Sequence, residues 1–257
     1  MLGKLIKQEW KANIRILLPL YMILVCTTLI TSLLAHWDND FSNLITVLST
    51  FSYGISLLLI AAGTTILLYV RFYKNLLTDE GYLMFTLPVN TSDLVLSKLI
   101  ISCFLTIASV IATILSLLSL VYASGHYETV KAGINYVWEE LVRETGLSTP
   151  LLITIAAVLL LLSVVSSIVL VYFAIALGQL FTGHRIIGAF VSYGAIYVVM
   201  EILLFALMMV FMLINGPGYM DAPDISLFLG MTIFIFILTA VGYLGTVNVL
   251  KKKLNLE

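Results

Sequence analysis

Long apolar runs alternate with short polar segments along the whole chain. The runs fall at about 16–35, 43–70, 98–123, 150–177, 186–214 and 225–249. Each is long enough for an α-helix to cross a hydrocarbon core of about 30 Å. A helix in a soluble protein would instead keep a polar face along its length. The pattern therefore predicts an all-α, polytopic membrane protein with six transmembrane helices in a single domain, residues 1–257.

The first 15 residues show a different pattern, with apolar and basic positions on opposite sides of a helix. Leu2, Leu5, Ile6, Trp10 and Ile14 recur at steps of mostly three or four residues. The basic residues Lys4, Lys7, Lys11 and Arg15 lie mostly on the other side. This pattern is typical of an amphipathic helix in the membrane interface. We expect residues 1–15 to form such a helix, with an ordinary charged lead-in to the first span as the alternative.

A second amphipathic segment lies between the third and fourth spans, at 126–144. In "YETVKAGINYVWEELVRETG" the apolar side chains form one stripe and the charged side chains occupy the opposite face. We expect an extracellular helix that lies on the outer membrane surface or covers the bundle. A lid over an outward exit is one interpretation of this helix, and a packed cover without a gating role is the other.

Composition and charge agree with the membrane assignment. Hydrophobic residues make up 61% of the chain and charged residues only 11%, whereas soluble domains carry about 25% charged residues. The two cysteines, Cys26 and Cys103, fall inside predicted spans, which favours small apolar fillers over a disulfide framework. A net charge of −1 gives no indication of a nucleic-acid partner.

The distribution of basic residues predicts the orientation. The N-terminus, the 71–98 loop, the 178–185 turn and the C-terminus together hold 11 of the 13 Lys and Arg residues. The positive-inside rule then places these segments, and both termini, in the cytoplasm. Lysines in the C-terminal "KKKLNLE" can also attract anionic lipid.

The segment "TDEGYLMFTLPVNTSD", residues 78–93, has more structure than a simple turn requires. Thr78 can cap a short helix whose first turn holds two acidic residues, a placement that the helix dipole favours. Pro88 would end that helix, and Asn90 or Thr91 would cap the next one. A short exposed helix with aromatic residues needs a cover. Membrane surface or a groove in a soluble partner can supply it.

This segment resembles the loop between the second and third spans of six-span bacterial ABC transporter permeases of the type-two exporter class. The similarity rests on an acidic-Gly-Tyr-Leu stretch, a Thr-Leu-Pro-Val stretch and a capped helix ending in Ser-Lys. The matching residues here are Glu80, Gly81, Tyr82, Leu83, Thr86, Leu87, Pro88, Val89, Ser97 and Lys98. The turn "IALGQLFTGHRIIGAFVSYG" and the basic start are also similar to that family.

The resemblance implies a permease subunit in the bacterial cytoplasmic membrane. In that family the 71–97 loop holds a coupling helix that docks on an ATPase subunit, so its docking residues would be Asp79, Glu80, Tyr82, Leu83, Phe85 and Pro88. The implied partners are ABC ATPase subunits, a second permease subunit and membrane lipid, with ATP and Mg on the ATPase. One departure is the short "NGPGYMDAPD" between the last two spans, where many members carry re-entrant helices.

The chain carries no motif for catalysis of its own. No phosphate-binding loop of the G-x-x-x-x-G-K-[ST] type occurs, so ATP hydrolysis is expected on another chain. His36, His126 and His184 are scattered over different loops, which gives no zinc-site spacing. We therefore predict a non-enzymatic subunit with no catalytic residues, no metal site and no bound cofactor.

Two groups of polar residues inside the spans are candidates for the translocation path or an interface between permease subunits. Glu201 lies near the middle of the fifth span and shares a face with Tyr197. A Ser/Thr row, which includes Thr106, Ser109 and Thr113, follows the third span. For Glu201 a packing role is an equal alternative, and for the row a packing seam is the favoured one.

Two functions remain from the sequence. The first is an ATP-driven exporter of a hydrophobic or amphipathic substrate, such as an antimicrobial peptide. The second is a non-transporting scaffold or sensor subunit that recruits a cytoplasmic protein through residues 78–93.

Overall fold

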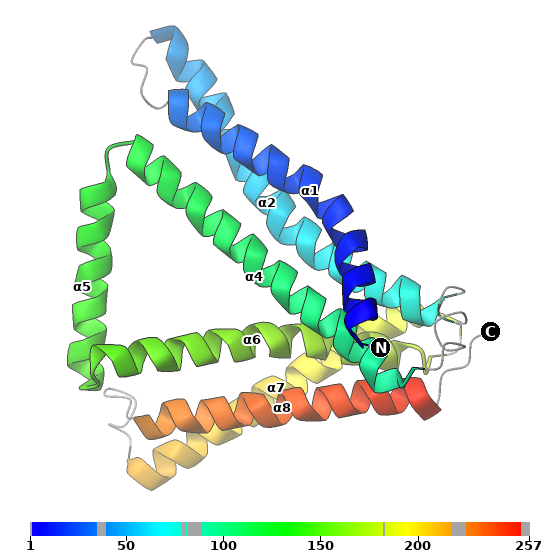
Figure 1. Ribbon diagram of the computed structural model, residues 1–257. Helices are drawn as coiled ribbons and strands as arrows, with labels where there is room; N and C mark the ends of the chain where they lie inside the picture. Colours follow the sequence, from blue (N-terminus) through cyan, green and yellow to red (C-terminus); the bar gives the residue numbers. More distant parts are fainter. Residues whose placement is uncertain are drawn as a thin grey trace. The chain divides into compact units, whose positions relative to one another are not determined.

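The computed structural model describes residues 2–34, 40–78, 81, 89–181, 183–216 and 225–252. Within this part of the chain all regular structure is α-helical (Figure 1). The elements are α1 (Leu2–Leu34), α2 (Asp40–Leu77), α4 (Thr91–Ala123), α5 (Tyr127–Thr145), α6 (Thr149–Gly178), α7 (Arg185–Asn215) and α8 (Ile225–Lys252).

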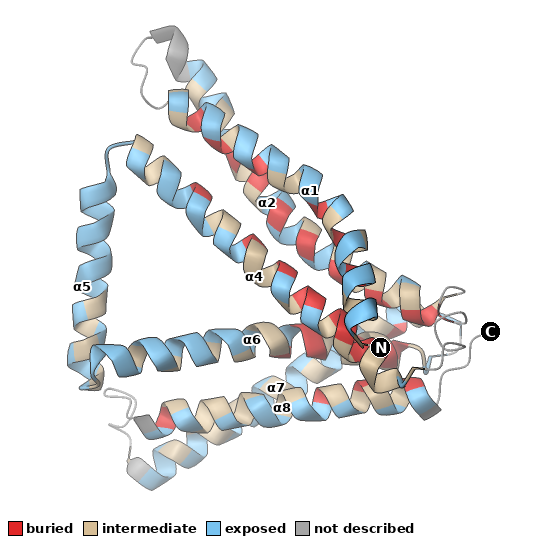
Figure 2. Cartoon of the chain, in the orientation of Figure 1, coloured by how far each residue is buried: buried red, intermediate tan, exposed pale blue. Residues whose placement is uncertain are grey.

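Six of these helices, all except α5, are long and apolar enough to cross a membrane. Large apolar side chains are exposed along all six. Figure 2 shows the exposed residues in pale blue. Soluble monomers rarely expose continuous apolar surface of this kind. In a bilayer the same surface contacts lipid tails. The expected all-helical, multi-pass membrane protein is therefore confirmed at this level.

The helix boundaries differ from the predicted ones at the N-terminus. Residues 1–15 and 16–35 were expected as an interfacial helix followed by a span, but α1 runs unbroken from Leu2 to Leu34. Pro19 lies inside it and removes only one helical hydrogen bond, the one to the residue 15 carbonyl. No glycine or second proline interrupts the helix near this position. The amphipathic start is therefore part of the first membrane helix.

The second and third membrane helices are longer than their apolar runs. α2 continues to Leu77 and α4 already begins at Thr91, whereas the predicted spans ended at 70 and began at 98. Backbone hydrogen bonding continues a helix past the hydrocarbon boundary as long as no residue breaks it. Both helices therefore project into the 71–97 loop.

The chain divides into two compact units, which are described separately. Unit 1 comprises Met1–Arg71 and Ile100–Val137, and unit 2 comprises Phe72–Leu99 and Trp138–Glu257. α2 and α4 each contribute to both units, because unit 2 takes the last turns of α2 and the first turns of α4.

In unit 1, α1, α2 and α4 meet through apolar clusters and through hydroxyl groups. One cluster centres on Leu17, Leu68, Ile101 and Leu105. A second cluster adds Leu24, Tyr53 and Ile60. Where α1 and α2 lie side by side (Figure 1), Thr27 Oγ1 donates to Ser56 Oγ at 2.9 Å.

Ser109 is the centre of the hydroxyl contacts in unit 1. Its hydroxyl is 2.7 Å from the Tyr21 hydroxyl of α1 and 3.0 Å from the Thr64 hydroxyl of α2. Ser116, two turns further along α4, is 2.9 Å from the Tyr53 hydroxyl. The row predicted along the third span therefore joins three helices of one chain. Such bonds satisfy hydroxyl groups where no water is present.

In unit 2, α6 packs against α7 and α8, and small residues permit the close approach. A side chain added at Gly178 would lie 2.6 Å from the backbone nitrogen of Ala189 on α7. One added at Gly245 of α8 would lie 2.5 Å from the Phe173 ring of α6. Glycine at these positions lets the helices approach to contact distance, as is common between membrane helices.

The substitution Ser109→Leu tests the hydroxyl contacts that join α1, α2 and α4. The added bulk has no room between three helices, and the hydroxyl bonds to Tyr21 and Thr64 are lost. We expect a loss of about 1–3 kcal/mol of unfolding free energy, measured by thermal denaturation in detergent. The matched control is Ser119→Leu on the exposed side of α4, which should stay within about 0.5 kcal/mol. Equal stability of the two variants would contradict the packing role.

Candidate functional site

The structure describes the residues on both sides of the predicted docking segment. The residues expected to contact an ATPase, Asp79, Glu80, Tyr82, Leu83, Phe85 and Pro88, lie outside the described residues. The end of α2, the start of α4, Thr78, Gly81, Val89 and Asn90 are described, and all belong to unit 2. The positions of these flanks fix the points at which residues 79–88 leave α2 and return to α4.

The end of α2 is fixed by an aromatic stack and by deep burial. The Phe72 ring lies parallel to the Tyr172 ring of α6, with centroids 3.8 Å apart and an interplanar angle of 11°. Leu76 and Leu77 are 0% and 2% exposed. Thr78 directly follows the last helical residue, and its Oγ1 donates to the Lys74 carbonyl at 2.5 Å. The last turn of α2 is therefore held against α6.

The start of α4 is fixed in the same unit. Asn90 is its N-cap, because the Asn90 carbonyl accepts the amides of Asp93 at 2.9 Å and Leu94 at 3.3 Å. Asp93 lies in the first turn. The Ser92 hydroxyl is 2.9 Å from the Tyr243 hydroxyl of α8, which also donates to the Ser92 carbonyl at 3.2 Å.

The first turns of α4 are also deeply buried. The residues concerned are no more than 5% exposed: Leu94, Val95, Ser97 and Lys98. Burial of the Lys98 ammonium is costly and requires polar partners. This part of α4 is therefore an integral part of unit 2.

Gly81 shows that the chain turns tightly after α2. Its amide donates to the Thr78 carbonyl at 2.7 Å, and the residue is buried. A Cβ at this position would lie 2.5 Å from the carbonyl oxygen of Leu76. Only glycine can place its backbone this close to the end of α2. The glycine of the acidic-Gly-Tyr-Leu stretch is thus needed for this turn.

Residues 79–88 are therefore tied at both ends to one rigid base, which we call the anchored base: Phe72–Thr78 and Asn90–Lys98 together with their contacts on α6 and α8. A force on a segment held in this way passes to the helices that hold it. Sites built on such packed elements are more precise than sites on free loops.

The second candidate site, Glu201, lies on the exposed face of α7. Tyr197 lies one turn earlier on the same face of the helix. Both residues are exposed within the chain, and no residue of the most apolar 18-residue window of α7 is buried. A charge near the centre of a bilayer costs roughly 2.5–3.5 kcal/mol on insertion scales. This face therefore favours contact with another protein or with water over contact with lipid.

Gly194 lies on the same side of α7. A Cβ added there would meet nothing within 4 Å, so the described helices of unit 2 leave space beside it.

Two of the three hydroxyl residues predicted for the path or interface, Ser109 and Thr113, have hydrogen-bond partners within the chain. Ser109 is buried between α1 and α2, and Thr113 donates to the Ser109 carbonyl at 2.9 Å. Thr106 is half-buried. These contacts favour the packing seam over an open track for substrate, and a role of this row in transport stays a prediction.

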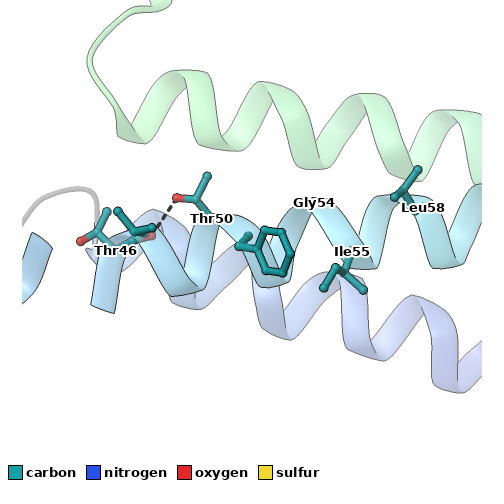
Figure 3. A pocket seen from close by; sticks show the side chains of 7 residues that line it. Thr46, Thr50, Gly54, Ile55 and Leu58 are labelled. Atoms are coloured by element: carbon teal, nitrogen blue, oxygen red, sulfur yellow. Dashed lines mark hydrogen bonds between the residues drawn. The ribbon is translucent and has the colours of Figure 1, made fainter. Parts of the chain in front are cut away.

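A shallow apolar recess lies on the exposed side of α2 (Figure 3). Its seven lining residues all belong to this helix: Thr46, Val47, Thr50, Phe51, Gly54, Ile55 and Leu58. The Thr50 hydroxyl donates to the Thr46 carbonyl at 2.8 Å, so it is satisfied within the helix. The recess thus presents mainly hydrocarbon.

The outer helix α5 forms as predicted, but this chain does not bury its apolar stripe. All of α5 is described, and none of its residues is buried. Ile134 and Val137 of the stripe are 60% and 57% exposed. Both interpretations of this helix, a lid over an outward exit and a packed cover, stay predictions.

An ion pair near the start of α1 was not foreseen from the sequence. Glu9 is buried, and its Oε2 lies 3.8 Å from Nη2 of Arg71 on α2. Asn13, one turn later, is also buried and donates to the Glu9 carbonyl at 2.9 Å. The pattern had placed Trp10 and Ile14 on the apolar face of an interfacial helix, opposite the basic residues. The polar residues Glu9 and Asn13 could be recognised only once α2 was known to supply a cation.

No cluster of three or more potential metal ligands occurs among the described residues. No protein-family model, no curated protein and no solved structure matches this chain.

The substitution Gly81→Ala tests the turn that begins the docking segment. The added methyl group would collide with the Leu76 carbonyl, which is held in the buried end of α2. We expect a destabilisation of about 1–3 kcal/mol, measured by thermal denaturation in detergent. The matched control is Gly133→Ala in α5, where a Cβ meets nothing within 4 Å and helix propensity favours alanine by up to about 1 kcal/mol. A neutral Gly81→Ala would contradict the tight turn.

Proposed function

We propose that this chain is the transmembrane subunit of an ATP-driven exporter in the bacterial cytoplasmic membrane. Both termini would lie in the cytoplasm, and residues 79–88 would dock on a separate ATPase subunit. The anchored base is the observation that carries the proposal, since it ties both ends of this segment to the membrane helices. The likeness of the segment to the permease coupling loop supplies the kind of partner.

The anchored base suggests how the coupling would work. Movement of the ATPase would displace residues 79–88, and the rigid flanks would transmit the displacement. The Phe72–Tyr172 stack leads to α6, and the Ser92–Tyr243 contact leads to α8. α2 and α4 also extend into unit 1, so both units would feel the movement.

The chemistry of ATP hydrolysis would belong to the partner. ATP and Mg would be bound there, and this chain would supply docking and conformational change. Its acidic residues Asp79 and Glu80 and its aromatic residues Tyr82 and Phe85 would form the docking surface. Aromatic anchors commonly carry most of the binding energy in such contacts.

A second permease subunit, either a copy or a homologue, would cover the Glu201 face of α7. Polar side chains in membrane helices favour interfaces or water-filled paths. Because Glu201 and Tyr197 are exposed within the chain, the partner helix would come from another subunit. The path between two such subunits would then contain one carboxyl group and one phenol from each chain.

The apolar character of the exposed membrane surface favours a hydrophobic or amphipathic substrate. Few fixed charges are available to bind a sugar or a metal ion, and the α2 recess presents mainly hydrocarbon. A membrane-active peptide has the matching chemistry.

Co-purification from gently solubilised membranes tests the docking segment. The double variant Glu80→Arg, Phe85→Ala reverses one charge and removes one aromatic anchor. We expect the wild type to retain an ATPase subunit and the variant to lose at least about tenfold of it, since hot-spot residues each contribute about 2 kcal/mol.

The matched control for this experiment is Glu139→Arg, Tyr136→Ala on the exposed surface of α5. This variant should retain the ATPase at the wild-type level. Absence of an ATPase from every sample, with another cytoplasmic protein lost only from the docking variant, would favour the scaffold function instead.

Disulfide cross-linking tests the α7 interface. In a background with Cys26 and Cys103 replaced by alanine, Glu201→Cys should form a cross-link to a second permease subunit. Ile202→Cys, its 62% exposed neighbour, points about 100° away and should cross-link much less.

The stability of the protein in lipid nanodiscs tests the alternative that Glu201 faces lipid. If Glu201 faced lipid, Glu201→Leu would stabilise the protein by up to about 3 kcal/mol. Such stabilisation, or equal cross-linking of both cysteine variants, would contradict the interface.

A further inference from the structure

The first membrane helix carries an unbalanced charge. α1 contains four basic residues, Lys4, Lys7, Lys11 and Arg15, and one acidic residue, Glu9. All four basic residues are exposed. At about 100° per residue they fall within roughly 80° of the helix circumference. We call this set the basic stripe.

The single acidic residue lies on the other side of the helix. Glu9 is buried and paired with Arg71 of α2. Its carboxylate is therefore screened from the basic stripe, although the two are close in sequence. The exposed face of the first four turns of α1 presents positive charge with no described negative charge of α1 to balance it.

Aromatic and aliphatic neighbours place the basic stripe at the boundary of the hydrocarbon. Trp10 lies beside it, 36% exposed, with its ring 5.1 Å from Phe104 in an edge-to-face contact. Tryptophan prefers the headgroup level of a membrane. Ile16 and Leu18, one and three residues after Arg15, are 51% and 54% exposed and mark the start of the apolar surface.

We propose that the basic stripe binds the anionic headgroups of phospholipids in the cytoplasmic leaflet. The stripe extends over roughly 16 Å of helix, enough to contact more than one headgroup. Lysine and arginine can keep their stems along the apolar surface while their charges reach the phosphates. The proposal does not depend on ATP-driven transport, because it concerns only the contact of α1 with lipid.

The positive charge of the basic stripe and its position beside the apolar surface favour anionic lipid over an acidic protein as its partner. The stripe continues directly into the exposed apolar surface of the same helix, so the adjoining phase is the membrane surface. A cation near an anionic membrane surface contributes about a fivefold gain in affinity, which corresponds to roughly 1 kcal/mol. Four cations in one stripe therefore give a strong preference for anionic over zwitterionic lipid.

Native mass spectrometry of the full chain tests the proposal. Wild type and variants are reconstituted in vesicles with equal amounts of phosphatidylglycerol and phosphatidylcholine, then extracted in mild detergent. The ratio of the two retained lipids is the readout. We expect wild type to enrich phosphatidylglycerol. Replacement of all four basic residues by glutamine should reduce the enrichment at least about tenfold.

Two further variants separate charge from folding. Lys4→Arg, Lys7→Arg, Lys11→Arg keeps the charge and should keep the enrichment within about twofold. Gln8→Glu adds one exposed acid next to the stripe and should reduce the enrichment measurably without changing the fold. If the fourfold glutamine variant does not fold, Gln8→Glu decides the question.

The proposal is overturned if wild type shows no preference for phosphatidylglycerol, or if Gln8→Glu leaves the preference unchanged. It is also overturned if the arginine variant loses the preference as completely as the glutamine variant. Retention of an acidic soluble protein without a lipid preference would assign the stripe to that protein instead.

Discussion

The absence of water from the bilayer core is the constraint on which the rest of this structure depends. Every backbone polar group in that region must find a partner within the protein, and an α-helix satisfies these groups within a single segment. Hydroxyl side chains follow the same rule, so Ser109 meets Tyr21 and Thr64 from two other helices. Glu9 is buried opposite Arg71, because a carboxylate removed from water by packing needs a charged partner. Glu201 is the exception, since the chain leaves it exposed, and the proposed second subunit would supply its cover.

The anchored base connects this architecture to the proposed function. Residues 79–88 leave α2 through the tight turn at Gly81 and return to α4 at Asn90, and both ends are fixed to unit 2. The stack of Phe72 on Tyr172 and the contact of Ser92 with Tyr243 make the ends stiff. A stiff mount suits a segment that receives movement from a soluble partner. A segment serving only as a connection would need neither contact.

The sequence predicted what depends on local pattern and missed what depends on helix neighbours. Hydropathy alone identifies six membrane helices, and the cap at Asn90 with Asp93 marks the start of α4. The inward placement of Glu9 could not be predicted, because the cation that stabilises it is 62 residues away on α2. The continuity of α1 was missed because the pattern changes from amphipathic to apolar near residue 15, whereas packing against α2 and α4 continues along the helix. For Ser109 the row was visible in the sequence, but its partners Tyr21 and Thr64 required the fold.

The most direct measurement is photo-cross-linking in living cells, with a photoreactive phenylalanine in place of Tyr82 and, as a control, in place of Tyr136 on α5. Mass spectrometry would identify the captured molecules. A cross-link from position 82 to a soluble protein with a phosphate-binding loop, absent from position 136, is the result that an ATP-driven permease predicts. Capture of lipid alone at position 82, or of a protein without a nucleotide site, would contradict it.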